Sequence, residues 1–371
     1  MLFLASEALQ FVDQFAKRKS QLIGGFGLLV LGYLAAFTSP MHNLDYQTYQ
    51  AQYVITAGQP AGAWKFERGY SYLSVLFYKL GLSYQTFRTF LCLMAIIVLY
   101  MGVRRFTTNT PLFVGIYGAT VFLLDATQLR NFIMLSFVIL AISFLQEKNV
   151  KNYLIATFII LLSAQFHSLG YLFLLVVVLR LMSFNFLYKY ALWLVGAVVG
   201  VIMMINVVGV QRISKLVGRV LALVSSRANI GAKLASQYGN GSILIRYVAV
   251  GVSSIAAFLL IWFLYKVVAT SQDKKLINQF QLIYTVVLMS MLTLPTLSLA
   301  DDYSRIPRSI FLVVIIGIAI YYEHQHEFKV PRMSSLINLL IFLVCAMNGF
   351  SHLYMWGTYF RGSLLYLIKL A

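Results

Sequence analysis

Long apolar runs alternate with short polar connections along almost the whole chain. Many of these runs approach the roughly 20 residues that an α-helix needs to cross the hydrocarbon core of a bilayer. The pattern therefore predicts an all-α polytopic membrane protein with about 11 transmembrane helices, within a range of roughly 10–12. The expected spans lie near 21–38, 84–103, 111–124, 131–146, 153–166, 168–182, 190–208, 243–265, 277–298, 309–322 and 334–351. The runs at 111–124 and 131–146 are short enough for broken or re-entrant helices.

The amino-acid composition supports this prediction. Of the 371 residues, 60% are hydrophobic and 11% are charged, whereas charged residues make up about 25% of a typical soluble protein. The chain has no internal repeat, no low-complexity segment and no stretch polar enough for a soluble domain, so we expect a single integral membrane domain over residues 1–371. Cys92 and Cys345 lie inside apolar runs and indicate no particular chemistry.

Lysine and arginine cluster at every second short connection, as the positive-inside rule predicts for cytoplasmic loops. This pattern places the N-terminus in the cytoplasm and, with about 11 spans, the C-terminus outside. The clusters are Lys17 to Lys19, Arg104 with Arg105, Lys148 with Lys151, Arg180 with Lys189, Lys274 with Lys275, and Lys329 with Arg332.

One expected outer loop, residues 209–241, breaks this pattern because it carries arginines and lysines but no acidic residue. An anionic ligand outside the membrane would explain this loop and the net charge of +18, although long loops often escape the charge rule. The two ends of the chain are amphipathic. We expect an interfacial helix at residues 1–19 and another at residues 352–371.

The expected outer loop at residues 39–83 is the longest polar stretch and combines aromatic rings with charges. Asp45 and Tyr49 are four residues apart and would share one helical face, and Trp64, Glu67 and Arg68 follow. Rings beside carboxylates and arginines suit a sugar-binding surface, since apolar sugar faces stack on rings while hydroxyls need polar partners. An aromatic belt at the membrane interface would explain the rings equally well, but it would not explain Asp45 and Glu67.

A second polar segment lies between the runs that end at Leu124 and begin at Phe132. Ionisable residues so close to the hydrocarbon region are costly, and they usually face a water-filled cavity and serve a function. Arg130 would begin a span, where its guanidinium could clamp a phosphate or pyrophosphate; alternatively, it pairs with Asp125 and caps the turn. The polar residues of this segment are Asp125, Gln128, Arg130 and Asn131.

Further polar residues fall on the same expected outer side. His167 joins two spans almost without a loop and could accept a proton from a hydroxyl, or it could form only a hydrogen bond between helices. Arg88 also lies on this side, where it could guide anionic head groups. The segment from Asp301 to Arg308 pairs two aspartates with Arg305 and Arg308, which favours arginines directed at a phosphate over a metal site.

No other motif indicates a metal, a cofactor or a nucleic acid. The tract from Glu323 to Glu327 resembles a metal-binding sequence, but it is expected in a short solvated cytoplasmic loop. The chain has no nucleotide-phosphate loop, no paired-cysteine site and no nucleophile elbow, so we expect neither a bound cofactor nor a metal.

The order of these motifs resembles that of the EpsG family of Wzy-like exopolysaccharide polymerases, over roughly residues 40–350. The resemblance rests on Asp45-Tyr46 with Tyr49, Glu67 with Gly69-Tyr70, Gln128 to Asn131 opening a span, Phe166-His167-Ser168 two spans later, and Arg305 or Arg308 before a late span. It implies a multi-pass protein of the bacterial cytoplasmic membrane, similar to a GT-C-type membrane glycosyltransferase, that makes polysaccharides of the exopolysaccharide, capsule or O-antigen kind.

The resemblance also implies a reaction and partners. The chain would join oligosaccharide repeats linked to undecaprenyl pyrophosphate at the outer face, without a metal, next to membrane lipids and alongside a chain-length regulator and a flippase. His167, Glu67 or Asp45 would be the general base, and Arg130, Arg305 and Arg308 would stabilise the departing pyrophosphate. The remaining substrate contacts would come from Arg68, Arg88, Asp125, Gln128, Asn131, Tyr49 and Trp64.

Three alternatives share part of this pattern. A flippase of lipid-linked sugars would need charges at mid-membrane depth, whereas these lie at one face. A polysaccharide ligase would need the same site as a polymerase. A membrane acyltransferase would need a cytoplasmic site, and no cytoplasmic polar residues converge in the sequence.

Overall fold

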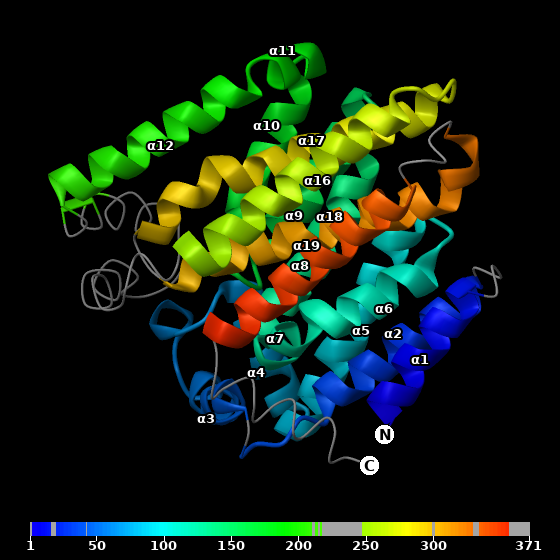
Figure 1. Ribbon diagram of the computed structural model, residues 1–371. Helices are drawn as coiled ribbons and strands as arrows, with labels where there is room; N and C mark the ends of the chain where they lie inside the picture. The colour runs from blue at the N-terminus through cyan, green and yellow to red at the C-terminus, as the bar shows by residue number, and fades with distance from the viewer. Residues whose placement is uncertain are drawn as a thin grey trace. The chain divides into compact units, whose positions relative to one another are not determined.

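The computed structural model describes residues 2–15, 20–41, 43–209, 212–213, 216, 247–298, 301–328 and 334–355. Within these ranges every regular element is helical and there is no strand (Figure 1). Residues 16–19, most of the 209–241 loop and residues 356–371 lie outside the described part, and so do the predictions made for them. The predicted all-α class is confirmed.

The helices group into two compact units, and each unit is made of segments from separate parts of the chain. The first unit contains Met1–Leu174, Ile315–Glu327 and His352–Ala371, and the second contains Leu175–Val314 and Phe328–Ser351. The single domain expected over the whole chain stays a prediction, and each unit is described on its own.

The first unit begins with eight α-helices. Their bounds are α1 Leu2–Phe15, α2 Gln21–Ala36, α3 Leu44–Ala57, α4 Arg68–Lys79, α5 Tyr84–Arg104, α6 Thr110–Thr120, α7 Phe122–Thr127 and α8 Leu129–Phe144. A short 3₁₀ turn, Ala61–Ala63, separates α3 from α4, and α9 (Val150–Ser163) leads into the 3₁₀ helix Ser168–Phe173. The apolar run at 111–124 is therefore broken, as its short length suggested, at Val121 between α6 and α7.

Local capping explains where several of these helices start. The side chains of Ser20, Asn43, Ser83 and Asn149 each accept a hydrogen bond from a backbone N–H in the first turn of α2, α3, α5 and α9, respectively. Such caps satisfy donors that a helix N-terminus otherwise leaves open. The helices α2, α3, α5 and α9 thus have defined starts.

The contacts near the start and near the end of helix α5 define two opposite ends of the first unit. Near its start Arg88 donates to carbonyls at the end of α2, and near its end Gly102 lies against the backbone of Leu140 in α8. The site end of the unit is therefore where α2 ends, α5 and α8 begin, and α9 ends. The opposite end is where α5 and α8 end and where α6 and α9 begin.

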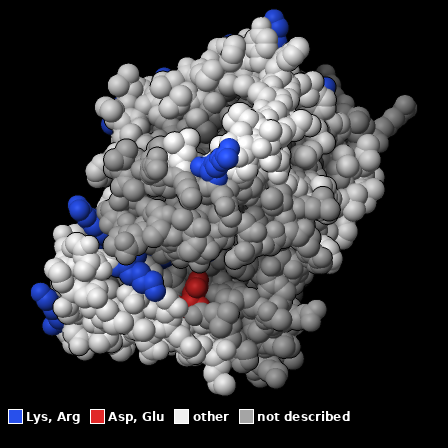
Figure 2. All heavy atoms as spheres, turned by 90° about the vertical axis from the view of Figure 1, so that its left-hand side faces the viewer, with Lys and Arg blue, Asp and Glu red and all other residues white. Residues whose placement is uncertain are grey.

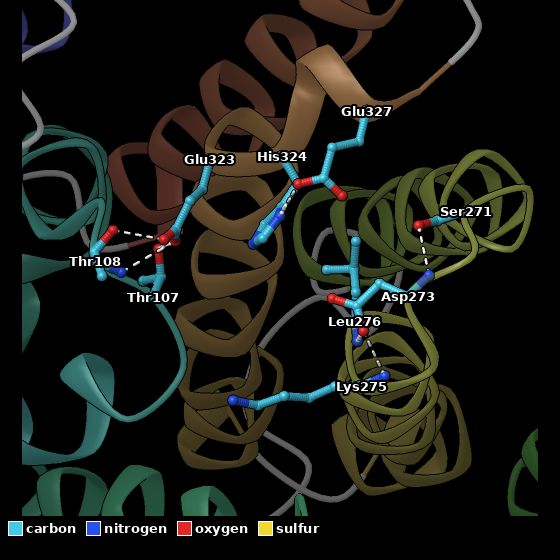
Figure 3. Close-up of polar contacts among 9 residues, drawn as sticks. All are labelled: Thr107, Thr108, Ser271, Asp273, Lys275, Leu276, Glu323, His324 and Glu327. Atoms are coloured by element: carbon cyan, nitrogen blue, oxygen red, sulfur yellow. Dashed lines mark hydrogen bonds and ion pairs between the residues drawn. The ribbon is translucent and has the colours of Figure 1, made fainter.

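Glu323, near the end of α18 (Arg305–His324), closes this opposite end. Its carboxylate accepts hydrogen bonds from the Thr107 and Thr108 hydroxyls and from the Thr108 backbone N–H (Figure 3). The sequence suggested a solvated loop here, and that expectation was wrong for Glu323 and His324, which continue the helix. The reason is that two adjacent threonines supply the donors that the carboxylate would otherwise seek in water.

Helix α1 has an unusual orientation in the first unit. Its outward side chains are apolar, and they include Leu4 and Val12 at 51% and 61% exposure. The polar residues Glu7 and Gln10 instead face glycines of α2 and α6: a Cβ at Gly118 would lie 2.3 Å from Glu7 Oε1. An apolar outer face and a buried polar face fit a helix with lipid on one side. The interfacial placement of residues 1–19 stays a prediction.

The second unit consists of long apolar helices joined by short turns. The elements that belong to it wholly or in part are α10 Leu174–Leu181, α11 Phe184–Lys189, α12 Ala191–Val208, the π-helix Tyr247–Gly251, α16 Val252–Val268, α17 Lys274–Thr293, α18 and α19 Ser334–Met355. Asp273 caps α17 through Lys275 N and Leu276 N (Figure 3). The buried Arg180 side chain donates to Asn278 Oδ1 at 2.6 Å, which fixes α10 to α17.

Helix length and hydropathy support a multi-pass membrane protein. Six described helical segments are long and apolar enough to cross a bilayer, and four shorter apolar segments accompany them. The six are Tyr84–Arg104, Ala191–Val208, Tyr247–Val268, Lys274–Ser298, Arg305–Glu327 and Ser334–Ser351; the shorter ones are Gln21–Ala36, Leu129–Phe144, Val150–Ser163 and Ser168–Leu181. The structure thus supports a helical membrane protein, whereas the count of about 11 spans depends on how the shorter helices are placed in the bilayer.

Candidate functional site

Three segments far apart in the sequence meet at the site end of the first unit. They are the connection before α4, the start of α8, and the end of α9 together with the 3₁₀ helix that follows it. The backbone N–H of Tyr70 donates to the Gln165 carbonyl at 3.1 Å and joins α4 to the end of α9. Gly69 permits this approach, because a Cβ there would lie 2.6 Å from Gln165 Cβ and 3.0 Å from its carbonyl oxygen.

Glu67 and Arg130 form a buried ion pair in this region. Glu67 is the N-cap residue of α4 and only 1% exposed, and its Oε2 accepts from Arg130 Nη1 at the start of α8. Glu67 Oε1 accepts from the backbone N–H of Ser168 at 3.0 Å. The ion pair that the sequence suggested between Arg130 and Asp125 is therefore not the one the structure shows. Glu67 pairs with Arg130 instead, because the connection before α4 lies against the start of α8.

Two aromatic rings also pack near the Arg130 guanidinium. Its central carbon lies 4.1 Å from the Phe66 ring centroid and 5.6 Å from that of Tyr49. Cations are attracted to aromatic faces, and more strongly where water is excluded. Arg130 is therefore fixed by a carboxylate and two rings at the first turn of α8, where the exposed N–H groups of the helix also favour negative charge.

His167 directly precedes Ser168, whose backbone N–H donates to Glu67 of this ion pair. It is 6% exposed, and its Nδ1 accepts a hydrogen bond from the backbone N–H of Leu169 at 3.2 Å. A backbone N–H can only donate, so in the neutral ring Nδ1 is unprotonated and Nε2 carries the proton. In this arrangement His167 offers a hydrogen-bond donor at Nε2 rather than a base.

The remaining polar residues of the 125–131 segment are also buried. Asp125 accepts from the Tyr117 hydroxyl at 3.2 Å and is fully buried, and Gln128 is 3% exposed between α7 and α8. Asn131 is 1% exposed, and its amide makes no hydrogen bond within the described part of the chain. A buried amide without partners is costly, and this makes Asn131 a candidate for contact with a ligand.

Arg88 connects several elements around the site. Its Nε and Nη2 donate to the carbonyls of Ala35 and Ala36 at the end of α2, and Nη2 also reaches the Ala126 carbonyl in α7 at 2.9 Å. Its guanidinium lies 5.2 Å from the Tyr46 ring centroid. Three carbonyls accept hydrogen bonds from Nε and Nη2 of this fully buried side chain, which assigns it a positioning role, while Nη1 makes no hydrogen bond within the described part of the chain. Contact with head groups stays a prediction.

The aromatic residues of the predicted sugar surface lie inside the 39–83 segment. Tyr49 packs on Phe66 and Tyr70, and Trp64 meets the Tyr72 ring edge to face at 4.7 Å. Burial raises the pKa of Tyr70 well above its ordinary value, so its phenol remains protonated. Arg68 is exposed and Asp45 is half-buried. Stacking of Tyr49 and Trp64 on sugars stays a prediction, since each of the two already contacts another ring of the segment.

Two comparisons with known proteins found no match, one with curated proteins and one with solved structures. A comparison with protein families did find one: the model of the EpsG family matches residues 25–361. The chain belongs to the EpsG family. EpsG is a family of Wzy-like polysaccharide polymerases, so the membership supports a role in polysaccharide biosynthesis in a membrane.

In this EpsG-family chain the matched region, residues 25–361, includes Glu67, Arg130 and His167, which we call the cluster. The cluster brings together Glu67, Arg130 and His167, which the sequence had singled out separately. Arg305 and Arg308 belong to the second unit, where Arg305 is half-buried at the start of α18 and Arg308 is 1% exposed. The side chains of Asp301 and Asp302 lie outside the described part.

Sequence reasoning missed the contacts that organise the cluster. Phe66 packs on the Arg130 guanidinium, and the backbone N–H of Ser168 donates to Glu67. No sequence pattern predicts either contact. Among the described residues no group of three or more His, Cys, Asp or Glu could hold a metal ion. On the face drawn in Figure 2 the described basic side chains appear at several places and the acidic ones in a small patch, in line with the net charge of +18.

Proposed function

We propose that this chain is a polysaccharide polymerase that joins oligosaccharide repeats linked to polyprenyl pyrophosphate at the outer face of the bacterial cytoplasmic membrane. The growing chain would pass from its lipid pyrophosphate to a terminal hydroxyl of the next lipid-linked repeat. The observation that carries this proposal is the convergence of Glu67, Arg130 and His167 in a chain that belongs to the EpsG family.

The departing pyrophosphate needs positive charge, and arginines supply it. Arg130 presents a guanidinium fork at the first turn of α8, and such a fork matches phosphate oxygens. The roles implied for Arg305, Arg308 and the basic 209–241 loop stay predictions. Arginines can stabilise a leaving anion without a metal, so the proposed reaction is metal-independent.

The three candidate bases differ in their surroundings. The hydrogen bond at Nδ1 makes His167 a donor through Nε2, suited to a phosphate or sugar oxygen. Glu67 is an acceptor that Ser168 holds in place, and we assign the proton-accepting role to it. Asp45, half-buried in the 39–83 segment, is the remaining candidate. Arg68, Gln128 and Asn131 would contact the sugars or phosphates.

The charge at the opposite end of the first unit supports the proposed orientation. Arg104, Arg105, Lys148 and Lys151 are exposed there, away from the cluster. Basic residues remain on the cytoplasmic side, so the cluster would face outward and the N-terminus would be cytoplasmic. We further propose about 11 spans and a fold similar to that of GT-C-type glycosyltransferases. A flippase and a chain-length regulator would be partners.

The test is the size of surface glycans from cells that carry the wild type or a variant in place of the native chain. We expect Arg130→Ala and His167→Ala to reduce long polymer to single repeats when the amount of glycan is normalised to the amount of folded protein. Lys79→Ala is the matched control, because Lys79 is an exposed basic residue in the last turn of α4 and touches none of the cluster. Its polymer ladder should equal that of the wild type.

Other outcomes of the same experiment would contradict the proposal. Long polymer that stays on its lipid carrier and fails to reach a final acceptor would identify a ligase. Repeats that accumulate inside the cell would identify a flippase. A normal ladder from Arg130→Ala would remove the arginine from the reaction.

A further inference from the structure

The ion pair between Glu67 and Arg130 is held from both sides by other groups. The two residues lie 63 positions apart in the sequence, and both are almost fully buried. Ser168 donates to the second oxygen of Glu67, and Phe66 packs on the guanidinium at 4.1 Å. Each partner would therefore remain in position if the bond between them opened.

The closed pair suits neither of the two roles proposed above. A guanidinium beside a carboxylate stabilises the charged carboxylate, which makes Glu67 a poor proton acceptor. The same contact occupies part of the fork that Arg130 would need for phosphate oxygens. Its Nε makes no hydrogen bond within the described part of the chain, so one donor of this buried fork is still unused.

We propose that the Glu67–Arg130 pair is a latch that the pyrophosphate of the lipid-linked donor opens. The anion replaces Glu67 on Arg130, and the released Glu67 then accepts a proton from the acceptor sugar. This inference rests on the proposed polymerase function and adds an order of events to it. The leaving group must be bound before the base becomes active.

The chemistry of the opened state is balanced. A lone pair of the acceptor hydroxyl oxygen forms the new bond to the anomeric carbon of the donor sugar. The bond between that carbon and the pyrophosphate oxygen breaks, and its electron pair leaves on the pyrophosphate beside Arg130. The hydroxyl proton moves to Glu67 and later to solvent. No oxidant, reductant or further reactant is required.

The latch also has a consequence for hydrolysis. Without a bound donor Glu67 remains paired, so no active base is present to activate water or a misplaced hydroxyl. The pairing thus restricts the active state of the site to complexes that contain the pyrophosphate.

The experiment measures binding of inorganic pyrophosphate to the purified full-length chain in detergent, with a chelator present and the ionic strength held constant. Glu67→Gln keeps an oxygen for the Ser168 N–H but removes the competing charge. We expect it to bind pyrophosphate at least about tenfold more tightly than the wild type. Arg130→Ala, and the double variant with Glu67→Gln, should show no specific binding. Lys79→Ala should bind as the wild type does.

A second variant keeps the test valid if Glu67→Gln does not fold. Glu67→Asp retains the charge opposite Arg130 but shortens the side chain, so it weakens the latch without leaving a buried cation alone. Its affinity for pyrophosphate should lie between those of the wild type and Glu67→Gln. An affinity equal to that of the wild type in every folded Glu67 variant would overturn the latch.

Failure of the latch is distinguishable from failure of the proposed function, because polymer length is measured separately. Under the latch, Glu67→Gln binds pyrophosphate more tightly and makes no long polymer. Tighter binding with a normal polymer ladder would overturn the base role of Glu67. A wild-type chain that supports no polymer at all would instead refute the polymerase, whatever the binding data show.

Discussion

Two polar regions are buried in the first unit, and they differ in how their charges are satisfied. In the site, Glu67 is paired with Arg130 and accepts a further hydrogen bond from Ser168. On α1, Glu7 is also buried, but neither of its carboxylate oxygens accepts a hydrogen bond within the described part of the chain. Burial alone therefore does not mark a functional site. The proposed site differs from the α1 region in that opposite charges from distant segments converge there.

The two regions should consequently respond to mutation in opposite directions. Removing one member of a paired buried charge leaves its partner uncompensated, which is strongly destabilising. Neutralising an unpaired buried charge removes a desolvation penalty and should stabilise the fold. The predictions below test this contrast, from the largest expected effect to the smallest.

Arg130→Ala should have the largest effect, because it leaves the buried Glu67 carboxylate without its cation. We expect a loss of about 3–5 kcal/mol in the free energy of unfolding, measured by denaturation of the purified protein in detergent. The double variant Glu67→Gln with Arg130→Met should recover much of this loss but still make no long polymer. If Arg130→Ala were as stable as the wild type, the ion pair would not be formed in solution.

Arg88→Met should come next. The substitution preserves much of the side-chain volume but removes the donors to Ala35, Ala36 and Ala126. Buried carbonyls that lose their donor cost about 1–3 kcal/mol each, and partial replacement by other donors gives an expected loss of about 2–4 kcal/mol. The measurement is the same unfolding experiment. Arg88→Lys should retain part of the stability, and an unchanged stability in Arg88→Met would contradict the positioning role.

A smaller effect is expected from the glycine at the site. In Gly69→Ala the new Cβ would meet Gln165, including its backbone oxygen at 3.0 Å, so α4 must move away from the end of α9. We expect a loss of about 1–3 kcal/mol and shorter polymer. Gly118→Ala is the matched control in the α1 region, because its Cβ meets only the flexible end of Glu7. Equal losses in both variants would contradict the distinction between a rigid and an adaptable contact.

Much of the fold follows from the sequence in physical terms. Apolar runs predicted the helices closely, because a helix in lipid must satisfy its own backbone groups and be apolar along its length. The expected span at 84–103 is α5, Tyr84–Arg104, and the short run at 111–124 is broken at Val121. The orientation of α1 could not be read in this way. Helical periodicity shows that a helix has two faces but not which of them meets lipid.

The site was predictable only in part. Glu67, Arg130 and His167 stood out because ionisable residues are rare in apolar surroundings. Their partners did not, since the pairing of Glu67 with Arg130 spans 63 positions, and the only partner that the sequence offered for Arg130, as an alternative, was the nearby Asp125. The role of His167 as a donor depends on one backbone hydrogen bond to Nδ1, and no sequence pattern specifies that bond.

Glu7→Gln should have the smallest effect and the opposite sign. Burial raises the pKa of Glu7 to about 8. Between the ordinary value of 4.5 and about 8 the folded chain keeps a proton that the unfolded chain releases, so the stability of the wild type falls as the pH rises across this range. Glutamine does not titrate, so Glu7→Gln should be more stable by about 1–2 kcal/mol at pH 7.

The pH dependence distinguishes this effect from a general gain in packing. The advantage of Glu7→Gln in unfolding midpoint should be small at pH 5, grow towards pH 8 and stay constant above it. Because the Glu7 carboxylate packs against Gly118 of α6 and takes no part in the Glu67–Arg130 pair, the polymer ladder should not change. An advantage that is the same at pH 5 and pH 8 would mean that Glu7 is already ionised in the folded chain, and the contrast between the two buried regions would then fail.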